Sequence, residues 1–200
     1  MDSIVNQIEK RIASWKRGKI FFPTDFSDVA SYDAIRKTLE RLCKSEKIIR
    51  LARGIFLYPA IDTQWGLGVI YPPIEEIAKR VAKHEKCRIV PTGAYALNVL
   101  GLSTQVPTNA VFFTDGAPRN IKVGIGRGIT FKHTSEVKKL AFRSEMMMLI
   151  SSAMREIGEG KITDEQKQII SEHLQNVSAD DFKYDINLMP EWVRKTLQEL

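Results

Sequence analysis

The sequence predicts an α+β protein, in which an N-terminal winged helix-turn-helix precedes a small antiparallel-sheet α+β domain with a helical C-terminal tail. Three observations lead to this prediction. A helix with a basic face is followed by a β-rich hairpin between Phe22 and Pro59. Short β-like runs separated by turn residues occupy 110–132, and helical patterns continue beyond Ser135.

The first helix is predicted from apolar residues at helical spacing near the N-terminus. Ile4, Ile8 and Ile12 repeat every four residues, which places them on one face. The run 20–22 then predicts a short extended piece. Residues 23–30 contain Thr, Asp and Ser at capping positions, so they predict a brief capped helix and a tight turn.

The second helix of this module is the expected recognition helix. Its buried stripe is predicted from the 3.6-residue spacing of Ile35, Leu39, Leu42 and Cys43. Its opposite face carries charged side chains: Asp33, Arg36, Lys37, Glu40, Arg41 and Lys44. Two β-rich runs, 48–51 and 55–58, follow and are joined by Ala52-Arg53-Gly54, which predicts a hairpin.

A helix of this kind fits the major groove of B-form DNA, where its basic side chains meet bases and phosphates. The candidate DNA-contacting residues are Ser31, Tyr32, Arg36, Lys37, Arg41 and, at the hairpin tip, Arg53. Arginine matters because its planar fork pairs with guanine O6 and N7. One alternative is that the charges form an ordinary solvated face. Another is that the winged helix is a protein-interaction module that binds a toxin or another protein.

Charge is unevenly distributed along the 200 residues, which carry a net charge of +6. Residues 1–60 contain 12 Lys+Arg against 7 Asp+Glu, 61–142 contain 11 against 6, and 143–200 contain 7 against 11. A basic front suits a polyanionic partner, because neutralised phosphates supply most of the sequence-independent affinity for DNA. The expected partner is double-stranded DNA, since a helix does not fit the narrow major groove of RNA.

The composition favours a cytoplasmic protein without a membrane segment. Cys43 and Cys87 are the only cysteines and lack CxxC spacing, so we expect reduced thiols in packing roles. The longest apolar run, 146–150, is far too short to cross a bilayer. The three methionines of that region are expected to fill a helical core.

The second domain, 61–200, is expected to begin with a connecting segment at 61–71, after a first domain of residues 1–60. A helix is predicted from Ile74 to about His84, and another from Gly93 to Leu100 that a left-handed cap ends at Gly101. Three strands are predicted to form the antiparallel sheet: 110–114, 120–124 and 128–132. Helix-start boxes are expected at 163–166 and 178–181.

Residue types that are catalytic in other proteins give no strong indication of an enzyme here. The glycines of 124–128 precede a strand-like run rather than a helix, so a hairpin loop is favoured over a phosphate loop. Asp115 with Glu136 and Lys138 resembles the carboxylate and lysine set of metal-dependent nucleases, which we keep as a weaker alternative. The histidines lack zinc-site spacing. We therefore expect no enzymatic activity, no metal and no cofactor.

The N-terminal segment resembles the winged-helix domain of AbiE-type antitoxins, the regulator halves of type IV toxin–antitoxin systems. The residues that carry this resemblance are Ser31-Tyr32-Asp33-Ala34-Ile35-Arg36-Lys37 and Ile49-Arg50-Leu51-Ala52-Arg53-Gly54-Ile55-Phe56. The remainder resembles a bacterial family of uncharacterised proteins of roughly this length, described as AbiE-antitoxin-like. The matching runs are 71–78, 93–107 and 189–192.

The resemblance implies a cytoplasmic bacterial regulator that binds operator DNA and represses its own operon. It also implies a nucleotidyltransferase-like toxin as a possible protein partner. The chain departs from the pattern between the recognition helix and the hairpin, where Ser45-Glu46-Lys47 replaces the glycine-containing turn common in such modules. The hairpin is therefore expected at a different angle, and Arg53 is a weaker candidate than Arg36.

Overall fold

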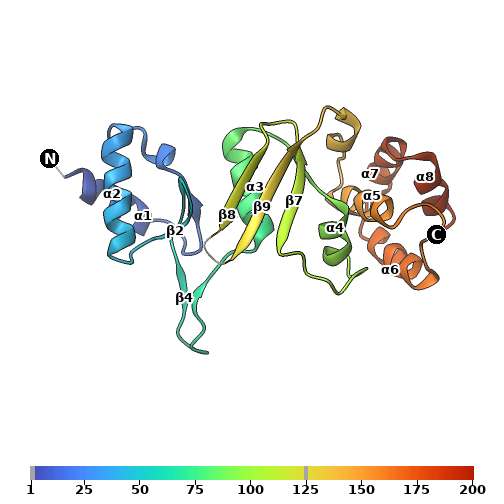
Figure 1. Cartoon of the computed structure of the whole chain (residues 1–200), viewed down its shortest axis with the longest axis horizontal. Coiled ribbons are helices and arrows are strands. Elements are labelled where there is room, and N and C mark those ends of the chain that lie inside the picture. Colours follow the sequence, from blue (N-terminus) through green and yellow to red (C-terminus); the bar gives the residue numbers. More distant parts are fainter. Residues whose placement is uncertain (1–2, 124–125) are drawn as a thin grey trace. The chain divides into compact units, whose positions relative to one another are not determined.

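A computed structural model describes residues 3–123 and 126–200 and shows an α+β protein, as predicted (Figure 1). Its contacts group into two compact units. The first reaches Arg80 and takes in the end of a later strand from Lys122, and the second holds Val81–Ile121 and Arg127–Leu200. The expected domain boundary near residue 60 is a prediction about which segments fold independently. A grouping of contacts does not test independent folding, so the boundary stays a prediction.

Helices and a small sheet enclose the core of the first unit. The elements are α1 (Ile4–Ala13), β1 (Ile20–Phe21), the 3-10 helix η1 (Pro23–Phe26), α2 (Tyr32–Lys44), β2 (Ile49–Ala52) and β3 (Ile55–Leu57). The strands form an antiparallel sheet in the order β1-β3-β2. Phe21, Phe26 and Phe56 meet in the core with Ile8 and Leu39. The predicted helices, extended piece and hairpin are therefore all present.

The segment 61–71, expected to be a plain connection, instead forms most of a second hairpin of the first unit, from β4 (Ala60–Asp62) and β5 (Gly68–Ile70). The prediction was wrong because its glycines make a turn rather than a flexible linker. The Asp62 carboxylate accepts hydrogen bonds from the backbone N–H groups of Gln64 and Trp65, which folds the chain back on itself.

The second unit contains a sheet of β6 (Ile89–Pro91), β7 (Asn109–Thr114), β9 (Arg127–His133) and β8 (Arg119–Val123), in that order. The prediction of an antiparallel sheet was wrong, because β7 pairs with β9 in parallel while β6 pairs with β7 antiparallel. Asp115 and Gly116, which follow β7, bond to residues of the neighbouring strands. Asp115 accepts from the backbone N and Nε of Arg88, and His133 Nδ1 lies 3.0 Å from Gly116 O. These bonds tie the end of β7 to β6 and β9, and β8 lies at the edge. Of the predicted loop 124–128, the first two residues lie outside the described ranges.

The helices largely follow the sequence prediction. They are α3 (Ile74–Glu85), α4 (Gly93–Val99), the 3-10 helix η2 (Val137–Leu140), α5 (Glu145–Ile157), α6 (Asp164–Leu174), α7 (Ala179–Asp185), the 3-10 helix η3 (Ile186–Leu188) and α8 (Glu191–Gln198). The predicted cap after α4 is confirmed, because Gly101 has a φ of +72° and Leu102 N donates to Leu97 O. The box at Thr163 and the N-cap at Ser178 are confirmed too.

Helices α5 to α8 gather into one cluster within the second unit (Figure 1). Its core includes Met147, Ile150 and Val193, all fully buried, and Met146 packs against it, which confirms the expected packing role for two of the three methionines. Asp185 is also fully buried, and its two carboxylate oxygens accept hydrogen bonds of 2.8 Å from the backbone N–H groups of Arg143 and Ser144. This carboxylate satisfies donors at the start of α5.

Candidate nucleic-acid interface

Helix α2 divides its side chains between the core and the solvent. Ile35, Leu39 and Leu42 are at most 3% exposed and pack in the core of the first unit. The charged residues all lie on the exposed face: Asp33, Arg36, Lys37, Glu40, Arg41 and Lys44. Burial of the apolar stripe thus fixes which side of the helix meets solvent.

The structure places five of the six predicted contact residues at or on α2. Ser31 is the exposed residue that precedes the helix, and its side chain makes no capping bond. Tyr32 is 59% exposed. Arg36, Lys37 and Arg41 are exposed along the helix, whereas Arg53 is exposed in the turn between β2 and β3. Arg53 thus belongs to a separate element.

The basic side chains of this helix are exposed and unpaired in the part of the chain that the structure describes. Among the described residues, Arg36, Lys37, Arg41 and Lys44 form no ion pair, although Glu40 has the i,i+4 spacing toward two of them. Arg36 and Lys44 are eight residues apart, about 12 Å along the helix. Lys44 was not among the predicted contact residues, although its position three residues after Arg41 places it on the same face. We call these four side chains the α2 basic face.

An ion pair fixes the turn that leads into α2. Arg11 of α1 donates to both carboxylate oxygens of Asp28, at 2.7 and 2.6 Å, and to the backbone O of Asp25 at 3.1 Å. The hydrogen bonds from Arg11 lower the pKa of Asp28 from its ordinary value of 3.8 to about 2. The carboxylate therefore stays charged at all physiological pH values, and the turn stays attached to α1.

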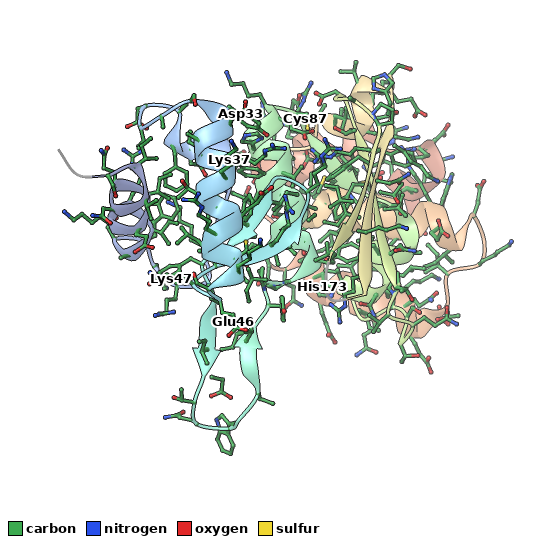
Figure 2. The ribbon with its side chains drawn as sticks, turned by 60° about the vertical axis from the view of Figure 1, so that its left-hand side comes forward. Asp33, Lys37, Glu46, Lys47, Cys87 and His173 are labelled. Carbon is green, nitrogen blue, oxygen red and sulfur yellow. The ribbon has the colours of Figure 1, made fainter. Side chains whose placement is uncertain are left out.

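The end of α2 is closed by a left-handed cap that contains no glycine. Glu46 has a φ of +58°, its N–H donates to Cys43 O, and Lys47 N donates to Leu42 O, a Schellman motif. Figure 2 shows Lys37 on the helix and Glu46 and Lys47 at the turn. The side chain of Lys47 pairs with Glu9 of α1 at 2.9 Å. Ion pairs with α1 thus lie at both ends of α2, and the apolar stripe of α2 packs in the core of the first unit. Together these contacts orient the α2 basic face.

The residues of the nuclease alternative are engaged by neighbouring cations. Asp115 pairs with Arg88 at 3.0 Å, and backbone and side-chain hydrogen bonds from Arg88 lower the Asp115 pKa. Glu136 pairs with Lys139 at 2.7 Å, which lowers the Glu136 pKa. Within residues 3–123 and 126–200, no group of three His, Cys, Asp or Glu side chains is placed to hold a metal ion. The geometry therefore gives the nuclease alternative no support.

The two cysteines are free thiols, and burial raises the pKa of Cys43. A thiol with a raised pKa holds less of the nucleophilic thiolate at neutral pH, which agrees with the predicted packing role. In the part of the chain that the structure describes, no helix combines the length and hydrophobicity needed to span a bilayer. The strongest candidate interface is the α2 basic face, because its four cations are exposed and unpaired among the described residues.

Comparison with known proteins gives a family but no activity. A family model described as "Family of unknown function (DUF6088)" matches residues 7–182, which include most of both compact units. The search of curated proteins finds no match to the chain. Because the matched residues make up most of its length, the chain belongs to the DUF6088 family.

Proposed function

We propose that this protein is a DNA-binding transcriptional regulator whose first unit acts as a winged helix. One observation carries the proposal: the four cations of the α2 basic face are exposed and unpaired among the described residues. Clustered positive charge on one helix face is what groove binding requires. The ties of α1 to both ends of α2 support it, since a reading helix must hold its orientation.

In this proposal α2 enters the major groove. Arg36 and Arg41 pair with base edges, because the guanidinium fork matches guanine O6 and N7. Lys37 and Lys44 meet phosphates, which set position and affinity rather than sequence. Arg53, in the hairpin turn, contacts the backbone beside the groove. Tyr32 and Ser31 lie at the start of the helix, where a hydroxyl can donate to a phosphate oxygen.

The test is the affinity of an Arg36→Ala, Arg41→Ala double variant for duplex DNA from upstream of its own gene. Each lost base contact is expected to cost about 1 to 3 kcal/mol, so affinity should fall by at least about tenfold. The control is a Lys167→Ala, Lys195→Ala double variant, which removes two cations from α6 and α8. Unchanged affinity in the arginine variant would contradict the proposal.

The finer part of the proposal is a cytoplasmic, antitoxin-like autorepressor of a type IV toxin–antitoxin operon. It is supported by the resemblance of residues 31–37, 49–56 and 93–107 to AbiE-type antitoxins. The identity of the adjacent gene tests the antitoxin role. A nucleotidyltransferase-like neighbour whose toxicity is relieved by co-expression of this protein is the expected result, and a neighbour of any other kind would remove the antitoxin role.

A second candidate function is protein interaction, which the β4–β5 hairpin favours. Ile61, Trp65 and Leu67 are 56%, 82% and 76% exposed, a concentration of apolar surface that is typical of contact sites. If the first unit binds a protein instead of DNA, a Trp65→Ser, Leu67→Ser variant should lose co-purification with the neighbouring gene product. In that case, the purified wild type should also ignore duplex DNA.

A further inference from the structure

The second unit contains a cavity of about 420 Å³, lined by residues of β6, β7, β9, η2, α4 and α5 and of the segments between them. This volume lies in the range of small-molecule sites. Strand pairing brings together the residues of the wall that the sheet forms. Val90 pairs with Phe113, and Phe113 pairs with Lys132, across three neighbouring strands. Gly93 closes one side, where a Cβ would overlap the side chain of Glu156 and push α4 away from α5.

Hydroxyl groups without partners line this cavity. Ser151 of α5 is 3% exposed, Ser152 and Thr92 are half-buried, and none of the three hydroxyl groups makes a hydrogen bond within the described residues. Among the described residues, Asp62 Oδ2 is the only buried side-chain polar atom without a partner, so these hydroxyl oxygens are open to the cavity. Each can therefore donate a hydrogen bond to an acceptor atom of a ligand that lies there.

The charges around the cavity favour an anion. Lys132, Lys139 and Arg155 line it against the single carboxylate of Glu156. Lys132 and Arg155 form no ion pair among the described residues, whereas Lys139 pairs with Glu136. Cations together with hydroxyl donors match the several acceptor oxygens of a phosphate group, and such charge-assisted hydrogen bonds are the strong ones.

The rest of the lining is apolar and aromatic. Phe113 and Phe142 border the cavity with Val90 and Val111, and Lys139 lies 4.8 Å from the centre of the Phe113 ring. Aromatic side chains stack on the flat faces of nucleobases. The cavity thus offers a phosphate-binding part and a ring-binding part within a volume too small for a duplex.

From this combination we propose that the cavity binds a nucleotide. Its phosphate lies near Lys132, Arg155 and the hydroxyl of Ser151, and its base lies against Phe113 and Phe142. The proposal concerns the second unit alone and does not depend on DNA binding by the first.

The test is calorimetric titration of the full-length protein with the four ribonucleoside 5′-mono- and triphosphates, inorganic phosphate and ribose 5-phosphate. At least one nucleotide should bind about tenfold or more tightly than either base-free phosphate. Lys132→Gln should weaken that binding about tenfold and Ser151→Ala several-fold. Lys138→Gln removes a nearby cation that does not line the cavity, and should have no effect.

Lys132 is exposed on β9, so its replacement should leave the fold intact, which the unfolding temperature checks. Equal binding of nucleotides and inorganic phosphate would overturn the proposal, as would undetectable binding of every nucleotide. Unchanged nucleotide affinity in folded Lys132→Gln would place the ligand elsewhere and overturn it too.

Discussion

The α2 basic face and the cavity beside Ser151 both hold cations without ion pairs among the described residues, but they present them differently. The side chains of α2 lie along the outside of a helix, over about 12 Å from Arg36 to Lys44. Those of the cavity surround a volume that is partly open to solvent, beside the hydroxyl of Ser151. An exposed row of charges suits a long polyanion, whereas a cluster around a cavity suits one small anion. The same residue types thus indicate two different ligands.

Charge reversal on α2 should weaken DNA binding by the first unit and leave nucleotide binding by the cavity unchanged. An Arg36→Glu, Arg41→Glu variant replaces two cations by two anions, so DNA affinity should fall by about a hundredfold or more at low salt. Nucleotide binding to the cavity should not change, because these arginines belong to the other unit. Fluorescence anisotropy for DNA and calorimetry for nucleotides measure the two effects. A parallel loss of both would show that the two regions are not separate.

Of the single substitutions considered, Asp185→Ala should give the largest loss of stability. The loss should occur in the second unit, which contains the cavity. The substitution leaves the partly buried N–H groups of Arg143 and Ser144 without their carboxylate, at a cost of about 2 to 3 kcal/mol. Urea unfolding monitored by circular dichroism measures the change. Asp180→Ala, at an exposed position of the same helix α7, should cost far less. Equal stability of these two variants would contradict the capping role of Asp185.

Glu46→Gly should stabilise the first unit by about 1 kcal/mol, because glycine adopts the left-handed backbone without the steric cost that other residues carry. Glu46→Ala retains that cost and serves as the control. Thermal unfolding of the three proteins measures the difference. If alanine stabilised as much as glycine, the gain would come from the lost carboxylate and not from the backbone.

Acid should weaken the tie between α1 and the turn before α2. The pKa of Asp28 is lowered by Arg11 to about 2, so the ion pair contributes stability that is fully present above about pH 4 and lost as pH falls toward 2. The effect should be small, since Asp28 is exposed. Urea unfolding of wild type and Asp28→Asn at pH 5, 3 and 2 should show a narrowing difference. A constant difference over this range would contradict the assignment.

Local sequence patterns predicted much of the first unit. The spacing of Ile35, Leu39 and Leu42 predicted both α2 and its exposed face, because helical period determines burial. In the second unit, the cap at Gly101 was predictable for a related reason, since glycine favours the left-handed backbone. Glu46 adopts the same backbone without a glycine, so no residue type marked that turn.

Features that depend on distant residues were not predictable in this way. The parallel pairing of β7 with β9 joins residues far apart in the chain, such as Asn109 with Gly128, and His133 Nδ1 lies beside Gly116 O at its end. The bond from Arg88 to Asp115 likewise joins the start of β6 to the end of β7. The cavity likewise combines Lys132 of a strand with Ser151 of a helix. Neither residue stands in a recognisable motif, because the site exists only when the sheet and α5 are packed.

The most direct measurement of the central claim is photocrosslinking to duplex DNA. A photoreactive amino acid replaces Lys37 on α2 in one variant and Lys167 on α6 in another. Lys37 is exposed (Figure 2) and Lys167 is partly exposed. If the α2 basic face contacts DNA, the protein labelled at residue 37 should crosslink and salt should suppress the reaction. Crosslinking from residue 167 alone, or equal crosslinking from both positions, would contradict it.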